Sequence, residues 1–252
     1  MNKTVLNVTG WVIILLTWYV ISALELVNTH ILPAPWNCIR VLGELLTEPN
    51  PQNSLISNIW FSVKLNLAGY FESIVLALPV GFAIGQSKTL RTMFSQQIDS
   101  LRFVPITALG GLFVALSGLT LWTKIHFLAF GIWVYLVPVI VQRIDEVNIV
   151  HLQMMQTLGA TKTQTFWYVT WRSVIARLSD DIRILIGIGW TYIIVAEMKN
   201  DQGGLGHMIA LGDKQALIEI VYIVVVTIII IGVLQDKLLK LLDWFAFKYK
   251  YS

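Results

Sequence analysis

Long apolar runs separated by short polar stretches dominate the hydrophobic pattern of the chain. The runs fall at 11–29, 57–85, 97–118, 122–141, 180–198 and 219–243. Each is close to or longer than the roughly 20 residues that an α-helix needs to cross the hydrocarbon core of a bilayer. The pattern therefore predicts an all-α integral membrane protein, a single domain of about six transmembrane helices.

Polar residues and prolines interrupt two of these runs. Run 57–85 contains Lys64, Glu72 and Pro79, and run 97–118 contains Pro105 followed by a pair of glycines. We expect Lys64 and Glu72 to contact neighbouring helices rather than a solute. A helix broken at Pro105 would instead expose backbone groups that a solute can use.

Three connecting segments are long enough to hold structure of their own. Segment 30–56 contains four prolines, and its residues 39–46 place apolar side chains at helical spacing, which predicts a helix in the membrane surface. Segment 199–218 is rich in glycine and ends in a short amphipathic stretch. Segment 142–174 is a polar insert between two apolar runs.

The N-terminal apolar run, 11–29, is too long for a signal-peptide core, and no A-x-A-like site follows it. We therefore expect this run to be retained as a span.

Composition supports a bilayer protein, and the absence of catalytic motifs argues against an enzyme. Of the residues, 56% are hydrophobic and 13% charged, whereas soluble domains have about 25% charged residues. One cysteine excludes an intrachain disulfide, and the four histidines are scattered, so no metal site is expected. No G-x-x-x-x-G-K-[ST] or G-x-S-x-G motif is present. We expect no catalytic residue, no cofactor in this chain and no nucleic-acid partner.

Lysine and arginine fall mostly on one side of the predicted spans. With the N-terminus inside the cell, the outer side carries Arg40, Lys124, Lys199 and Lys214, and most other basic residues near span ends lie on the inner side. The positive-inside rule then predicts that both termini and segment 142–174 are cytoplasmic, and that segments 30–56 and 199–218 are external.

The polar insert has the pattern of two short helices joined at a glycine. Val147, Val150, Met154 and Leu158 recur at helical spacing, and Gly159 can adopt a turn that a side chain disfavours. Thr161 or Thr163 is a suitable N-cap for a second helix. The residues alone leave two alternatives open: a knob that a partner binds, and a loop that folds back on its own bundle.

The insert resembles the cytoplasmic signature of ABC importer permeases, E-A-A-x-x-x-G followed by I-x-L-P. Gln153, Met154 and Met155 occupy the E-A-A positions, Gly159 matches the glycine and Val169 the isoleucine; Ala160 and Phe166 also match. The resemblance implies that these seven residues form the coupling helix, which sits in a groove of an ATPase subunit. Trp171 and Arg172 replace the leucine and proline. Loss of the Glu and gain of two adaptable methionines imply an altered groove in that ATPase.

Other stretches resemble the nitrate/sulfonate/taurine/bicarbonate permease subfamily. They are "LPAPWNCIRVLGELL", "LRFVPITAL", "IGIGWTYIIVAEM" and "GGLGHMI", which occur in the subfamily's order. The resemblance implies the type I (MetI-like) permease bundle in a bacterial inner membrane. It also implies a permease dimer, two ATPase subunits that hold ATP and Mg²⁺, and a periplasmic or lipid-anchored solute-binding protein. The implied solute is a small anion such as nitrate, a sulfonate, taurine or bicarbonate, although the subfamily also serves neutral aromatic solutes.

Five residues are candidates for the solute pathway: Arg102, Pro105, Thr107, Trp190 and Glu197. A charge in the bilayer costs about 2.5–3.5 kcal/mol on insertion scales, so charged residues in spans point to function. For three of the five residues, a purely structural role stays open as an alternative. Arg102 can extend to the headgroups, Trp190 can be packing, and Glu197 can be an interfacial carboxylate or a partner of Lys199 or a loop.

Two other functions compete with an ATP-driven importer. The altered signature residues are compatible with a transport-inactive membrane scaffold or regulator that keeps the permease fold. A proton-driven carrier is disfavoured because the chain has no internal repeat and few acidic residues within its runs.

Asp180 and Asp181 would open the fifth run, where carboxylates suit a helix N-terminus. We assign them no site.

Overall fold

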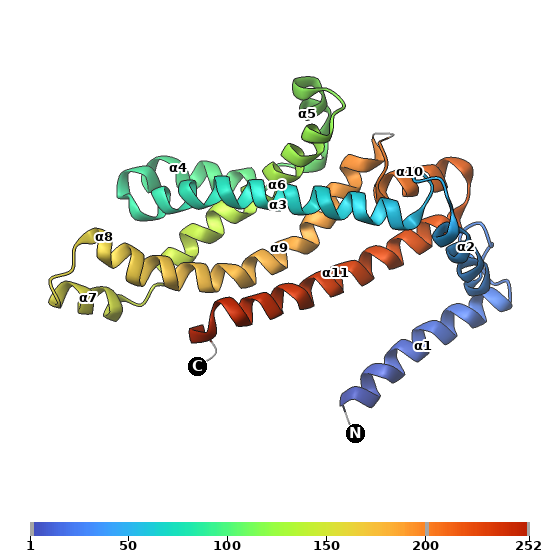
Figure 1. The fold of residues 1–252 in the computed structure, drawn as a ribbon, viewed down its shortest axis with the longest axis horizontal. Helices are drawn as coiled ribbons and strands as arrows, with labels where there is room; N and C mark the ends of the chain where they lie inside the picture. The colour runs from blue at the N-terminus through green and yellow to red at the C-terminus, as the bar shows by residue number, and fades with distance from the viewer. Residues whose placement is uncertain (1–2, 200–201, 251–252) are drawn as a thin grey trace. The chain divides into compact units, whose positions relative to one another are not determined.

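The computed structural model describes residues 3–199 and 202–250, and within these residues all regular structure is helical (Figure 1). The chain divides into two compact units, one from residues 1–62 and 197–229 and the other from residues 63–196 and 230–252. We call them unit 1 and unit 2 and describe each by itself. In chain order the helices are α1 (Lys3–Ala23), α2 (Pro35–Thr47), α3 (Leu55–Gln86), α4 (Lys88–Leu101), η1 (Ile106–Leu109), α5 (Gly110–Ser117), α6 (Leu121–Asp145), α7 (Ile149–Thr157), α8 (Lys162–Thr165), η2 (Phe166–Trp171), α9 (Arg172–Met198), α10 (Leu205–Gln215), α11 (Ile218–Ala246) and η3 (Lys248–Lys250).

Three of the described helices have both the length and the apolar composition of a membrane span. They are α3, α6 and α11, whose most apolar windows have mean hydropathies of 1.8, 1.9 and 2.6. The pair α4 and η1–α5 passes the same test together, with a bend of 87°. The apolar part of α1, Val8–Ala23, is shorter. The predicted helical membrane protein is therefore confirmed, and the total of six spans stays a prediction.

The third and fifth runs differ from simple straight spans. Pro105 is the N-cap of η1 with φ −69° and ψ 93°, so the backbone between α4 and η1 is extended and the run bends there. Helix α9 begins at Arg172 and continues directly from η2. Asp180 and Asp181 therefore lie inside a helix, and the prediction that they open one is wrong. The helical stretch starts earlier because α8 and η2 already supply the turns before it.

Close helix packing forms the core of unit 2. Leu128, Ile132, Leu136 and Ile140 of α6 have at most 1% exposure. A Cβ at Gly81 of α3 would lie 2.7 Å from Ile140, so a residue without a side chain lets the two helices approach, as is common in membrane bundles.

Unit 1 is assembled around α10. Leu205, Met208 and Ile209 of this short helix are buried, so the stretch predicted to be amphipathic packs its apolar side chains against the rest of the unit. Trp18 of α1 donates from Nε1 to the carbonyl of Pro33 at 3.0 Å. Its ring stacks on Tyr222 at 6.4 Å between centroids. These contacts fix α1 to the loop that precedes α2 and to the first turns of α11.

Candidate functional site

The strongest candidate site in unit 2 is the segment from Ile149 to Trp171, which we call the coupling segment. It consists of α7, a turn, α8 and η2. Figure 1 shows α7 and α8 as two short helices joined by that turn next to the beginning of α9. Asn148 begins α7 because its side-chain oxygen accepts the Val150 N–H at 2.9 Å, which satisfies a donor left free at the helix end.

The turn after α7 depends on glycine. Gly159 has φ +69°, in the left-handed region. Its N–H donates to the Gln156 carbonyl at 3.0 Å, and the Ala160 N–H donates to the Met155 carbonyl at 3.0 Å. These two bonds are the Schellman pattern that ends a helix and satisfies its last carbonyls. The predicted glycine turn is therefore present, and Met155 and Ala160 serve it through their backbones.

A capping box begins α8 directly after the turn. The Thr161 hydroxyl accepts the Gln164 N–H at 3.3 Å, and the Gln164 side chain accepts the Thr161 N–H at 2.8 Å. Of the two threonines predicted as caps, Thr161 has the role. The reciprocal bonds fix the angle at which the chain leaves Gly159.

Three aromatic rings anchor the second half of the coupling segment. Phe82 of α3 contacts Phe166 edge-to-face at 5.4 Å and stacks on Trp171 at 5.2 Å between centroids. We call these three residues the aromatic cluster. Thr170 is buried and Val169 is half-buried within the same turn. Trp171, which stands where the resembling family has leucine, is thus a packing residue at the root of the segment.

The other face of the coupling segment exposes large apolar side chains. Helix α7 contains no buried residue, and Gln153 and Met154 of the signature are exposed. The exposed fractions are 61% for Ile149, 60% for Val150, 52% for Met154, 74% for Leu158, 52% for Trp167 and 61% for Tyr168. Folding back onto the bundle would bury these side chains, so that alternative is wrong for α7. A concentrated set of exposed apolar side chains is typical of a protein-binding surface.

Ion pairs join the end of α6 to α9, the two helices that flank the coupling segment. Arg143 donates from Nε and Nη2 to the two carboxylate oxygens of Asp181, each at 2.7 Å, in the two-pronged geometry that arginine favours. Arg143 also donates to Glu146 at 2.6 Å, and Arg177 contacts the same carboxylate at 3.3 Å. The hydrogen bond from Arg143, aided by one from Gln142, lowers the pKa of Glu146. No sequence signal pairs Arg143 with Asp181, which lies 38 positions away.

Arg102 lines a cavity of about 430 Å³ between α4 and α6 in unit 2. Its guanidinium pairs with Asp99 one turn earlier, and Arg91 on the same cavity pairs with Asp145 at 2.8 Å. The two arginines and two aspartates balance, so this cavity has no net charge from these four groups. Pro105 and Thr107 are exposed beside the bend that follows.

Trp190 is buried in unit 2, with 5% exposure, and donates from Nε1 to the Gln235 side chain at 3.0 Å. It therefore joins α9 to α11 in this structure, in line with the packing alternative. A role in the solute pathway stays a prediction.

Glu197 lies in unit 1 and has no exposed surface. Ser62 donates to its carboxylate at 2.8 Å, and the Gly206 N–H donates to Oε2 at 2.9 Å. Leu205 N–H in turn donates to Ser62 at 2.8 Å. Glu197 thus caps the beginning of α10, where a negative charge is favoured. Glu197 therefore does not face water in this structure, and a role in the solute pathway stays a prediction.

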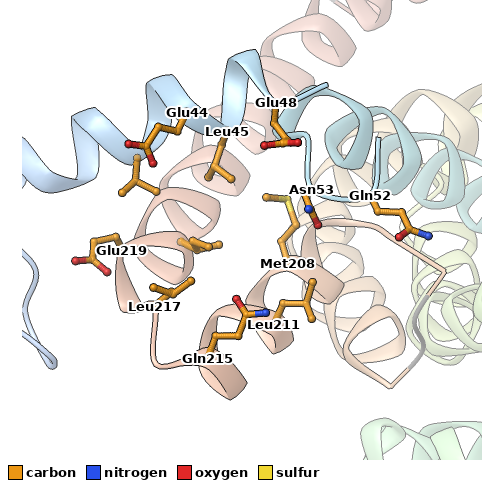
Figure 2. Close-up of a pocket in the computed structure, with 12 residues that line it drawn as sticks. Glu44, Leu45, Glu48, Gln52, Asn53, Met208, Leu211, Gln215, Leu217 and Glu219 are labelled. Atoms are coloured by element: carbon orange, nitrogen blue, oxygen red, sulfur yellow. The ribbon is translucent and has the colours of Figure 1, made fainter. Parts of the chain in front are cut away.

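A cavity of about 310 Å³ lies among α2, α10 and the start of α11 in unit 1 (Figure 2). Figure 2 shows Glu44 of α2 and Glu48, which follows that helix, on one side of it and Leu211, Gln215 and Leu217 on the other. Glu219 is a third carboxylate in the lining, which includes no lysine or arginine. Its negative charge makes this cavity unsuited to an anion. Among residues 3–199 and 202–250, no three His, Cys, Asp or Glu side chains form a group that could hold a metal ion.

The apolar spans define a helical membrane protein. The chain belongs to the family of binding-protein-dependent transport system inner membrane components, whose profile matches residues 73–244. That family comprises transport permeases rather than enzymes.

Curated relatives align with nearly the whole chain. It is 26% identical over 246 residues to the taurine transport system permease protein TauC of Escherichia coli (strain K12), covering 96% of this chain and 88% of that one. It is 25% identical to the putative aliphatic sulfonates transport permease protein SsuC of Bacillus subtilis (strain 168), covering 95% and 86%. The nitrate import permease protein NrtB of Synechocystis sp. (strain ATCC 27184 / PCC 6803 / Kazusa) is 24% identical, covering 92% and 85%.

Solved structures share the fold. A chain of the inward-facing MetNI methionine ABC transporter superposes with a TM-score of 0.64 at 18% identity, covering 75% of this chain and 94% of that one. A chain of an amino acid ABC transporter with histidines gives a TM-score of 0.62 at 15% identity, covering 82% and 96%. The predicted MetI-like type I importer fold is confirmed.

Proposed function

We propose that the chain is the membrane-spanning permease subunit of an ATP-driven importer. In this proposal the coupling segment sits in a groove of a separate ATPase subunit, which binds ATP and Mg²⁺. Two permease copies and two ATPases form the complex, and an external solute-binding protein delivers the solute. Both chain termini and the coupling segment are then cytoplasmic.

The exposed apolar face of the coupling segment is the observation that carries this proposal. Met154 and Leu158 lie on the α7 side of the Gly159 turn, and Trp167 and Tyr168 lie beyond it, all more than half exposed. The aromatic cluster anchors the C-terminal half of the segment, and the Arg143–Asp181 pair joins the two helices that flank it. The apolar face remains exposed. Binding of a partner to the face gains the free energy of apolar burial, about 25 cal/mol for each Å². Movement of the bound partner can then displace the segment together with the helices to which it is anchored.

The proposed solute is a small anion of the sulfonate, taurine, nitrate or bicarbonate class. The support is the agreement of three relatives whose names give taurine, aliphatic sulfonates and nitrate. These solutes share a compact oxyanion of one negative charge. Alternating access moves such a solute if ATP favours one conformation of the complex and its hydrolysis products favour another.

Reconstitution tests the proposal. The permease is purified with candidate ATPase and solute-binding protein subunits, placed in liposomes, and supplied with taurine, methanesulfonate, nitrate or bicarbonate. We expect a stable complex and uptake of at least one of these anions that requires internal ATP. A stable complex that hydrolyses ATP without moving any of them would favour the scaffold alternative. Uptake that continues without ATP and stops when the proton gradient collapses would favour a carrier.

A further inference from the structure

The last described residues of the chain fold back onto the root of the coupling segment. After α11 ends at Ala246, η3 (Lys248–Lys250) turns the chain toward α9 within unit 2. Tyr249 and Lys250 make specific polar contacts there, and we call these two residues the C-terminal hook. Neither belongs to the signature or to the resembling stretches of the sequence.

Lys250 joins α9 to α11 through one ammonium group. Its Nζ lies 2.7 Å from Asp180 of α9 and 3.1 Å from Asp243 of α11. The same Nζ donates to Ser179 at 3.3 Å, and Ser179 also donates to Asp243. Burial opposes the charge on Lys250, but hydrogen bonds to Asp180 and Asp243 outweigh it and raise the pKa of the lysine.

The need for this ammonium follows from the burial of Asp243. Its side chain is 2% exposed, whereas that of Asp180 is 47% exposed. Removing the ammonium would take the cation away from a buried carboxylate, and removing one member of a buried ion pair is costly. Lys250 therefore strengthens the contact between α9 and α11 at this level, beside the hydrogen bond from Ser179 to Asp243.

Tyr249 continues the connection to the coupling segment itself. Its hydroxyl donates to the carbonyl of Arg172 at 3.0 Å. Arg172 is the residue that follows η2, and its guanidinium lies 5.8 Å from the centre of the Tyr168 ring. Tyr168 is one of the exposed residues of the coupling segment. A continuous series of contacts thus leads from the exposed face to α11.

We propose that the C-terminal hook is a positioning element that makes α11 follow the coupling segment when the ATPase displaces it. The inference rests on the proposed function, because it assigns the hook a part in that same coupling. Arg183 and Asp236, 2.9 Å apart, form a second tie between α9 and α11 further along both helices. The hook is the connection nearest the coupling segment, so its loss lets the beginning of α9 move without the end of α11, although the two helices stay joined at Arg183–Asp236 and Trp190–Gln235.

The test compares two lysines of the same tail in the complete reconstituted complex. Lys250→Met removes the ammonium between the two aspartates, and Lys248→Met makes the same charge change at an exposed lysine. Tyr249→Phe removes the hydroxyl that donates to the Arg172 carbonyl, and Lys250→Arg keeps a cation. The readout is the number of taurine molecules taken up for each ATP hydrolysed, or of whichever tested anion the wild type transports. The distance between spin labels on α7 and α11, measured with ATP and with ADP, gives a readout that needs no solute.

We expect Lys250→Met to assemble and hydrolyse ATP while uptake for each ATP falls about fivefold or more, the low end of ordinary couplings between sites. Uptake for each ATP should also fall in Tyr249→Phe. It should equal the wild-type value in Lys248→Met, and most of it should remain in Lys250→Arg. The difference between the spin-label distances measured with ATP and with ADP should not be the same in Lys250→Met as in the wild type. An unchanged ratio and distance in Lys250→Met, or equal losses in both lysine variants, would overturn the inference. If Lys250→Met does not assemble, Tyr249→Phe decides, since it leaves the charges in place. A wild-type complex that neither binds the ATPase nor transports would instead refute the proposed function.

Discussion

Replacing Gly159 separates backbone geometry from side-chain contacts in the coupling segment. Gly159 has φ +69°, and a Cβ built on it meets no atom within 4 Å. Alanine therefore creates no clash, and its whole cost is the left-handed backbone, about 1–2 kcal/mol for an ordinary residue. Since 1.4 kcal/mol is tenfold in an equilibrium, Gly159→Ala should weaken ATPase binding up to about 5- to 30-fold. The assay is titration of the ATPase onto the permease in nanodiscs.

Two further substitutions show whether the backbone is the cause. Asparagine tolerates the left-handed region better than other residues, so Gly159→Asn should lose less affinity than Gly159→Ala although its side chain is larger. Gly43→Ala in α2 is the matched control, because that position is also open and has no positive φ. It should leave ATPase binding unchanged. Equal losses for Gly159→Ala and Gly159→Asn would show that side-chain bulk at the interface matters, and the backbone reasoning would fail.

Three other substitutions or conditions test the contacts that hold the structure. Phe82→Ala removes a 7% exposed ring from the aromatic cluster and should cost about 3–5 kcal/mol of unfolding free energy in denaturant titration, whereas Phe71→Ala, 72% exposed on the same helix, should stay close to the wild type. Gly204 has φ +106°, and a Cβ there would collide with the Glu197 carboxylate, so Gly204→Ala should cost about 2 kcal/mol or more and speed amide exchange in α10; unchanged exchange would refute the capping role. The pKa of Glu146 is lowered from its ordinary 4.5, so its stabilising effect is present above that value and lost as pH falls through the lower folded value; amide exchange at the start of α7 should rise in that acidic range beyond the intrinsic effect of pH, and Glu146→Gln should abolish this step.

Local sequence patterns predicted the parts of the structure that local physics determines. The Gly159 turn and the Thr161 cap depend on residues within a few positions of each other, and both are present. The apolar runs likewise identified α3, α6 and α11, because length and hydropathy suffice for a span.

Contacts between distant positions could not be predicted in this way. Ser62 and Glu197 lie 135 positions apart, so nothing near either residue indicates that the carboxylate caps α10 rather than facing water. Asp181 was predicted to lie at a helix end because the fifth apolar run begins there. The helix itself begins at Arg172, directly after η2, so it starts earlier than the apolar pattern indicates. Side-chain pairs of this kind depend on how helices pack, which hydrophobic spacing alone does not specify.

Chemical protection of Leu158 tests the central claim most directly. Leu158 is 74% exposed on the coupling segment, Phe103 is 88% exposed elsewhere in unit 2, and the native Cys38 is 8% exposed, which keeps the labelling background low. Single cysteines at Leu158 and Phe103 are modified with a water-soluble maleimide, with and without the ATPase. The account predicts that the ATPase slows modification at Leu158 at least tenfold and leaves Phe103 unchanged. Equal modification rates at Leu158 with and without a bound ATPase would contradict it.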